Sequence, residues 1–339
     1  QVLSFHRPAV SPTQTARGPV RAAIRLEYQL HLPQRLADDR RSRHGDVVVP
    51  AAVELSLDAG ASRMDVSVTC LNTAEDHRLR LLVSSGCHAD HVWADGHFHV
   101  LKRPVRPPSG KGWYQQPTGT THQRRFVAVS EEPRGLAVLN RGLCEYEPLA
   151  STAGVDIAVT LLRCVGWLSR EDLISRPQGA GPSLPTPEAQ CLGEHRFDLA
   201  IVSFAGPWWE SALPLEAERF CSPATVVRAS REVTASAFEL TPPLTLSAFK
   251  AAWRDDTTIL RIWNPAPVGV TGRLTLHRPV TEAHRVRLDE TRGPALTPPA
   301  GHLELQLGPA EVATFAFRFE PEQTSARGSV PAGEEEDVF

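Results

Sequence analysis

The chain has 339 residues, of which 41% are hydrophobic and 22% charged, and its formal net charge at pH 7 is -3. These values are typical of a soluble globular protein with room for two or three domains, and no stretch approaches the roughly 18 apolar residues of a membrane span. The nearly balanced charge argues against nucleic-acid binding, which depends on a strongly basic surface.

A period of two runs through the first part of the chain. Residues 24–32, 53–57 and 64–70 alternate apolar with polar side chains, which places every second side chain on one buried face of a strand. Each segment is therefore predicted to be a half-solvated antiparallel strand. Further strand-like runs follow at 126–129, 136–139, 155–162, 197–204, 259–263, 274–276, 303–307 and 315–319.

Turn-forming residues separate these strands, and helical patterns are scarce. Proline and glycine cluster at 58–60, 103–110 and 178–187, where they favour turns and loops. The best helical segment is 208–220, which we expect Pro214 to interrupt. Many strands without interleaved helices indicate stacked antiparallel sheets.

The strand pattern lapses after residue 205, before a second β region begins around Phe238. We therefore divide the chain into a large β-sandwich over 1–205, a helical connector with a smaller β domain over 206–320, and a tail over 321–339. The tail carries an acidic run and offers little to bury, so we expect it to be disordered.

The cysteines are widely spaced and form no C-x-x-C pair. This spacing fits reduced structural thiols in a cytoplasmic protein better than a secreted disulfide scaffold. Met64 is the only methionine, so Gln1 is not a translation start and we expect the chain to be a fragment or a trimmed product. The six cysteines are Cys70, Cys87, Cys144, Cys164, Cys191 and Cys221.

The segment 87–99 is the densest collection of metal-ligand residue types. Its cysteine, histidines and aspartates are ligands that zinc accepts, but no standard ligand spacing is present. We favour a polar loop that runs into a strand, with metal binding as the alternative. The residues concerned are Cys87, His88, Asp90, His91, Asp95, His97 and His99.

Two other groups have a structural and a functional interpretation. Trp208 and Trp209 are candidates for sugar stacking, although an aromatic pair at a domain junction more often fills a core. The run 72–78 reads as a structural turn, with Arg78 and Arg80 as alternative ligand-facing residues. No G-x-S-x-G, phosphate-loop, dinucleotide-binding or H-E-x-x-H motif is present.

Three segments resemble a known family. They are 134–147 (RGLAVLNRGLCEYE), 160–168 (TLLRCVGWL) leading to 181–193 (GPSLPTPEAQCLG), and 259–265 (ILRIWNP). In this order they resemble the C-terminal part of bacterial glycoside hydrolase family 38 enzymes, the branch of α-mannosidases and mannosylglycerate hydrolases. The resemblance extends over about residues 20–320.

The resemblance implies an all-β fold, with an antiparallel supersandwich of the galactose mutarotase type followed by a smaller C-terminal β-sandwich. The large sandwich is expected to lack its first strands. In this family an N-terminal domain carries the zinc ligands and the nucleophilic aspartate, and neither has a matching position in this chain. We therefore expect no catalytic residue, metal site or cofactor in this chain, and zinc in a separate catalytic domain that is its partner.

The resemblance also implies that the β region can lend a residue to the rim of the sugar pocket. Arg141 and Tyr146 are the candidates, because the turn at 140–142 can present a guanidinium that matches sugar hydroxyls or a carboxylate. The alternative is that Arg141 forms an ion pair with Glu145 or Glu147.

The resulting expectation is the structural and substrate-rim portion of a retaining α-mannosidase that acts on terminal α-mannosides and is inactive alone. The alternative is a free-standing carbohydrate-binding β module, whose platform would include Trp208, Trp209 or Trp113. A mutarotase-like enzyme ranks last, because the spacing identifies no His and Glu pair. We expect a mannoside substrate, neither nucleic acid nor membrane as a partner, and a homo-oligomer as an open alternative.

Overall fold

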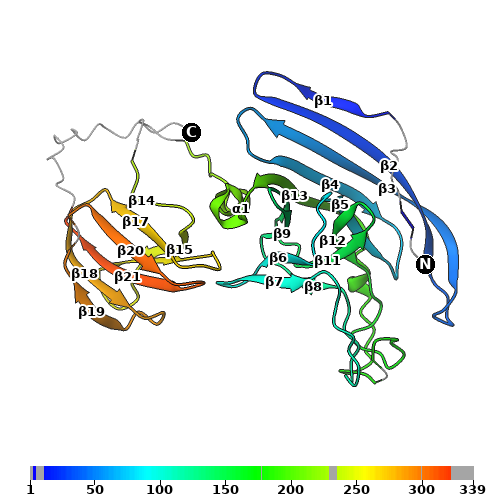
Figure 1. The fold of residues 1–339 in the computed structure, drawn as a ribbon. Coiled ribbons are helices and arrows are strands. Elements are labelled where there is room, and N and C mark those ends of the chain that lie inside the picture. The colour runs from blue at the N-terminus through cyan, green and yellow to red at the C-terminus, as the bar shows by residue number, and fades with distance from the viewer. Residues whose placement is uncertain (1–2, 5–10, 177, 229–234, 299, 322–339) are drawn as a thin grey trace, which may run out of the picture. The chain divides into compact units, whose positions relative to one another are not determined.

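The computed structural model describes residues 3–4, 11–176, 178–228, 235–298 and 300–321. Nearly all of its regular structure is antiparallel β-sheet (Figure 1), which confirms the all-β class. The expected disordered tail lies almost wholly outside the described residues. Tertiary contacts divide the chain into a large unit (Gln1–Glu232, Asn264–Val270 and Gly308–Glu311) and a small unit (Val233–Trp263, Thr271–Leu307 and Val312–Phe339).

The large unit contains a nine-stranded sheet and a four-stranded sheet. The nine-stranded sheet has the order β1 (Thr13–Arg17), β2 (Arg21–Leu36), β3 (Arg43–Asp58), β4 (Met64–Asn72), β13 (Gly193–Ala205), β10 (Arg134–Asn140), β9 (Phe126–Glu131), β6 (His91–Asp95) and β7 (Val100–Pro104). The four-stranded sheet has the order β5 (Arg78–Ser84), β12 (Gly154–Arg163), β11 (Glu145–Ser151) and β8 (Thr121–His122).

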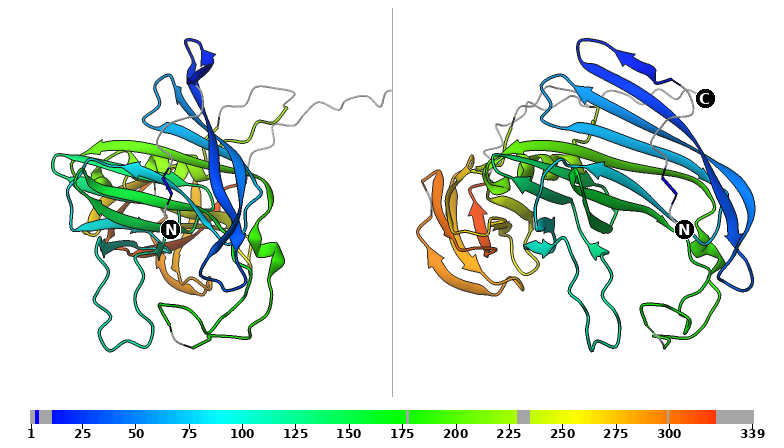
Figure 2. Two further views of the ribbon diagram at one scale, coloured as in Figure 1. Left: turned by 90° about the vertical axis from the view of Figure 1, so that its right-hand side faces the viewer. Right: turned by 45° about the vertical axis from the view of Figure 1, so that its right-hand side comes forward.

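The two sheets enclose the main core of the large unit. Every second residue of the central strands points inward, as the period of two predicts. Val127 and Val129 of β9 thus pack with Ile157 and Val159 of β12, and all four are fully buried. Figure 2 shows the long β2–β3 hairpin curving along one side of this unit.

The other face of the nine-stranded sheet is partly covered by helix. The 3-10 turn η2 (Trp208–Glu210) and helix α1 (Leu213–Cys221) follow β13, and α1 contacts β10 and β13. Pro214 lies in the first turn of α1 and does not interrupt it, because a proline there loses no intrahelical hydrogen bond. The large unit therefore continues past the predicted boundary at 205 and includes the helical connector.

One glycine of the large unit is required by backbone geometry. Gly154 opens β12 with a φ of 121°, and a Cβ added to it would lie 2.6 Å from the carbonyl oxygen of Cys87. The N–H of the next residue, Val155, donates a hydrogen bond of 2.8 Å to the same Cys87 oxygen and holds the start of β12 against Cys87. A side chain at 154 would therefore force the backbone apart.

The small unit is built from a three-stranded and a five-stranded antiparallel sheet. This is the smaller β-sandwich expected after the large one. The first sheet has the order β14 (Phe238–Leu240), β17 (Val270–Leu276) and β20 (His302–Leu307). The second has the order β15 (Thr245–Ala251), β16 (Thr258–Trp263), β21 (Val312–Phe319), β18 (Val280–Val286) and β19 (Arg292–Leu296).

Candidate functional site

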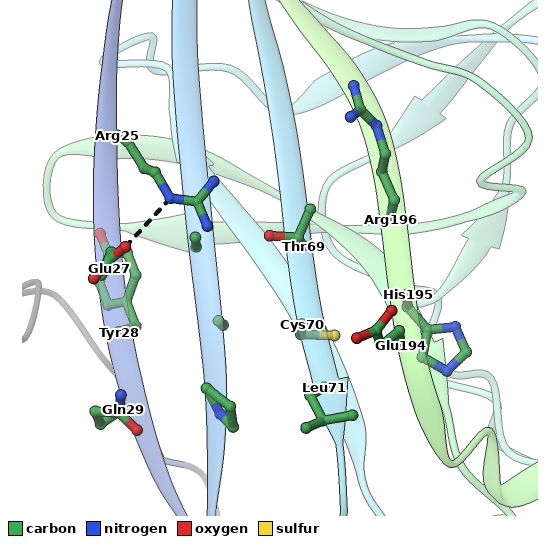
Figure 3. Close-up of a pocket in the computed structure, with 13 residues that line it drawn as sticks. Arg25, Glu27, Tyr28, Gln29, Thr69, Cys70, Leu71, Glu194, His195 and Arg196 are labelled. Atoms are coloured by element: carbon green, nitrogen blue, oxygen red, sulfur yellow. Dashed lines mark hydrogen bonds and ion pairs between the residues drawn. The ribbon is translucent and has the colours of Figure 1, made fainter. Parts of the chain in front are cut away.

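A groove of about 620 Å³ runs across the outer face of the nine-stranded sheet, on β2, β3, β4 and β13 (Figure 3). The alternation of β2 places Arg25, Glu27 and Gln29 on this face, while Leu30 is buried on the other. Because polar outward residues on strands are typical of an ordinary solvated face, no pattern in the sequence indicates this groove.

The floor of the groove is made by small side chains. Strand register aligns Glu27 with Ala52, Ala52 with Thr69, and Thr69 with Arg196. A short residue on each of the two central strands thus lies between longer residues on the flanking strands. This difference in side-chain length is what hollows the face.

Two guanidinium groups border this floor. Arg25 donates from Nε to Glu27 Oε1 at 3.3 Å, and Arg196 donates from Nε to Asp198 Oδ1 at 3.2 Å. Figure 3 shows Arg25 reaching from β2 over β3 and Arg196 rising from β13 beyond Thr69. A guanidinium presents a fork of donors that fits carboxylates and also bonds hydroxyl oxygens. The groove can therefore bind a polar, oxygen-rich ligand.

Arg141 lies beside the same face, held in place by Asp198. Its backbone N–H donates to the Asp198 carbonyl at 3.2 Å, and its Nη1 lies 3.5 Å from Asp198 Oδ2. Its Nη2 donates to the Phe220 carbonyl at 2.6 Å, and the guanidinium stacks 4.6 Å from the centre of the Phe220 ring. The side chain is 43% exposed, so part of it faces solvent.

Glu145 and Glu147, which were the predicted alternative partners of Arg141, bind other arginines. Arg78 lies 3.6 Å from a carboxylate oxygen of each, and Arg80 forms an ion pair with Glu147. The ion-pair alternative for Arg141 was therefore wrong in its partners. Arg78 and Arg80 serve this carboxylate network on the four-stranded sheet.

Tyr146 is fully buried in the core between the two sheets of the large unit. Strand β11 alternates, so Glu145 and Glu147 point away from the core and Tyr146 points into it. Burial raises the pKa of its phenol. The side chain has no exposed surface in this chain, so the structure gives it a packing position and not one at a rim.

The two predicted stacking tryptophans also pack. Trp208 is buried, with its ring 5.9 Å from that of Trp93 and 5.8 Å from that of Phe126. Trp209 is half-buried and stands perpendicular to Trp208, with 5.5 Å between the ring centres. Trp208 therefore offers no open ring face to a sugar.

The zinc-like segment 87–99 is split between separate environments. Cys87 lies in the core, and His91 Nδ1 lies 2.5 Å from Asp90 Oδ1. Among the described residues, no three His, Cys, Asp or Glu side chains are arranged to hold a metal ion. Nothing in the described part of this chain thus fits a zinc site.

Asp95 instead belongs to a buried ion-pair network that the sequence did not indicate. Arg125 donates to Asp95 from Nε at 2.8 Å and from Nη2 at 3.2 Å, and its Nη1 binds Glu218 of α1. Asp95 is fully buried and the Arg125 side chain is 7% exposed. Three separate parts of the chain meet here, so no local pattern could reveal the network.

The described residues include no helix long and apolar enough to cross a membrane.

Comparisons with known proteins agree with the fold. Residues 243–315 match the family model described as "Glycosyl hydrolases family 38 C-terminal beta sandwich domain". Over 197 residues, the chain is 32% identical to a Halalkalibacterium halodurans protein named "Putative mannosylglycerate hydrolase", covering 57% of this chain and 20% of that protein. The chain thus spans about a fifth of the length of this curated relative.

Two solved structures from Enterococcus faecalis share the fold over 91% of this chain, each at 24% sequence identity. One is an α-mannosidase, with a TM-score of 0.76 and 35% of its chain covered. The other is described as a protein in glycosyl hydrolase family 38, with a TM-score of 0.74 and 36% covered. The family model and the curated relative show that the chain is similar to the C-terminal β region of glycoside hydrolase family 38.

Proposed function

We propose that this chain is the structural and substrate-rim portion of a retaining α-mannosidase that hydrolyses terminal α-mannosides, and that it is inactive alone. The observation that carries the proposal is the family match to a C-terminal domain, which implies an N-terminal catalytic domain as partner. That domain would hold the zinc ion and the nucleophile. The six cysteines are free, consistent with our proposal that the enzyme works in the cytoplasm.

Arg141 is the residue of this chain that we propose for the rim. Its backbone is fixed by Asp198 and its guanidinium by Phe220, so the side chain is oriented before any substrate arrives. An oriented guanidinium loses little conformational freedom when it bonds a hydroxyl or carboxylate oxygen. Tyr146 of β11 packs in the core of the large unit, so we do not propose it as a substrate contact of this chain.

The test compares this chain alone with the same chain joined to a family 38 catalytic domain. We expect hydrolysis of 4-nitrophenyl α-D-mannopyranoside only by the joined protein. A charged hydrogen bond contributes roughly 1.5–3 kcal/mol, so Arg141→Ala should lower kcat/KM by about 10–100-fold. Arg21→Ala is the matched control, because Arg21 forms an exposed ion pair with Asp58 elsewhere in the large unit.

Two outcomes would contradict the proposal. Hydrolysis by this chain alone, at a rate comparable with that of the joined protein, would show that it contains its own active site. An Arg141→Ala protein with the kcat/KM of the Arg21→Ala control would remove Arg141 from the rim. Mannosylglycerate, the substrate in the name of the curated relative, should be assayed in parallel to decide between the two substrates.

A further inference from the structure

We infer that the small unit carries a saccharide-binding site centred on Trp253, in the hairpin between β15 and β16. The site is independent of the rim residue proposed above. Only the choice of mannose as the preferred sugar rests on the proposed function.

Trp253 is 87% exposed, which makes it the most exposed of the seven tryptophans. Burying a large apolar side chain stabilises a fold, and the fold forgoes this contribution at Trp253. Trp208, by contrast, is buried. An indole left open to solvent presents a flat apolar face with a polar edge, and pyranose rings stack their C–H face on such a surface.

The hairpin that carries Trp253 is held rigidly. The Trp253 backbone N–H donates to Glu290 Oε2 at 2.7 Å, and the other carboxylate oxygen of Glu290 binds the Lys250 ammonium. Across the hairpin, Ala252 N–H donates to the Thr257 carbonyl at 2.9 Å. A platform fixed in this way does not lose backbone freedom on binding, so more of the stacking energy is available for affinity.

Glu290 adopts an unfavourable backbone conformation to make this contact. Its φ is 64°, in the left-handed region that favours glycine, where the Cβ of any other residue crowds the following carbonyl oxygen. The turn itself is closed by backbone hydrogen bonds from Arg287 N–H to the Thr291 carbonyl and from Glu290 N–H to the Arg287 carbonyl, and a glycine at 290 would keep both. The side chain of Glu290 is thus explained by its contact with Lys250 and the Trp253 backbone, and not by the turn.

One charged group lies beside the indole, and further charged groups belong to the same hairpin or bind to it. The Lys250 ammonium lies 6.0 Å from the centre of the Trp253 ring, and Arg292 donates to Asp255 Oδ2 of the same hairpin at 2.9 Å. Ammonium, carboxylate and guanidinium groups bond the hydroxyls at the edge of a stacked sugar. Because the centre of a protein–protein interface is depleted of Lys, Glu and Asp, these neighbours favour a saccharide over a protein partner.

The test measures binding by the full chain in native gels that contain yeast α-mannan, with saturation-transfer NMR on methyl α-D-mannopyranoside as a second readout. We expect the mannan to retard the chain. Trp253→Ala should weaken binding at least tenfold, and Glu290→Gly should also weaken it, because glycine keeps the turn but removes the carboxylate that holds the Trp253 backbone. The matched control is Trp113→Ala, which removes another exposed tryptophan and should bind normally.

Several results would overturn the inference. One is a Trp253→Ala chain that binds as tightly as the unmodified chain. Another is a Trp113→Ala control that loses as much binding as Trp253→Ala. A third is that mannan, galactomannan, laminarin and hydroxyethyl cellulose all fail to retard the unmodified chain. Concentration-dependent self-association that disappears in Trp253→Ala would assign the residue to a protein contact and also overturn it. Trp253-dependent binding of a polysaccharide without mannose would support the saccharide site and contradict mannose as its preferred sugar. The α-mannosidase assay would then decide the proposed function separately.

Discussion

The buried network of Arg125 should be the most sensitive ionic contact of the large unit. Arg125→Ala removes the guanidinium that makes two hydrogen bonds to Asp95 and binds Glu218. Asp95 is fully buried, so its carboxylate would lose its counter-charge without gaining solvent. The remaining contact to the carboxylate is a backbone N–H at 3.2 Å.

Breaking a buried ion pair from one side typically costs about 3–5 kcal/mol, since the partner is left charged and unpaired. An exposed pair is worth about 0–1 kcal/mol. Arg21→Ala is therefore the matched control, because Arg21 and Asp58 form an ion pair with about half of each side chain exposed. The difference between the two variants isolates burial as the cause.

Urea unfolding followed by tryptophan fluorescence measures the effect, because Trp93 and Trp208 lie within the same large unit. For an m-value of about 2 kcal/mol per molar urea, Arg125→Ala should lower the midpoint by roughly 1.5–2.5 M, and Arg21→Ala by less than about 0.5 M. Replacing both partners, as Asp95→Leu with Arg125→Met, should recover part of the loss. Equal midpoints for Arg125→Ala and Arg21→Ala would refute this reasoning.

Three further predictions concern pH, backbone geometry and thiol reactivity. The hydrogen bond from Arg318 is the main cause that lowers the pKa of Glu282 from 4.5 to about 2, so this pair stabilises the folded state above pH 4.5 and the stabilisation is lost as the pH falls toward 2. Glu282→Gln should flatten that part of a plot of unfolding midpoint against pH, and an unchanged slope would contradict the assignment. Gly154→Ala should lower the free energy of unfolding by about 2–3 kcal/mol or more in the same urea assay. The reason is that the new Cβ would combine a φ of 121° with a contact of 2.6 Å to the Cys87 carbonyl oxygen. A loss below about 0.5 kcal/mol would show that the turn relaxes freely. Burial raises the pKa of Cys164 to about 12. Maleimide at pH 8 should therefore modify the exposed Cys144 and leave Cys164 unmodified, as measured by mass spectrometry. Equal modification rates of the two thiols would mean that the core opens readily.

The sequence by itself determined the fold class and the main strands. The predicted runs at 126–129 and 155–162 lie inside β9 and β12, and the run at 315–319 lies inside β21. The reason is that alternation is a local property of the strand backbone and is written in consecutive residues. The alternation at 145–147 also predicts that Tyr146 points into the core, because Glu145 and Glu147 flank it on both sides.

Only the tertiary structure decided which distant residues meet. Arg141 pairs with Asp198 of β13, and Arg125 joins Asp95 to α1, because sheet register and helix packing bring these segments together. The groove over Ala52 also depends on register, since each of its strands taken alone looks like an ordinary half-solvated strand. Partners across strands follow from long-range pairing that no short stretch of sequence records.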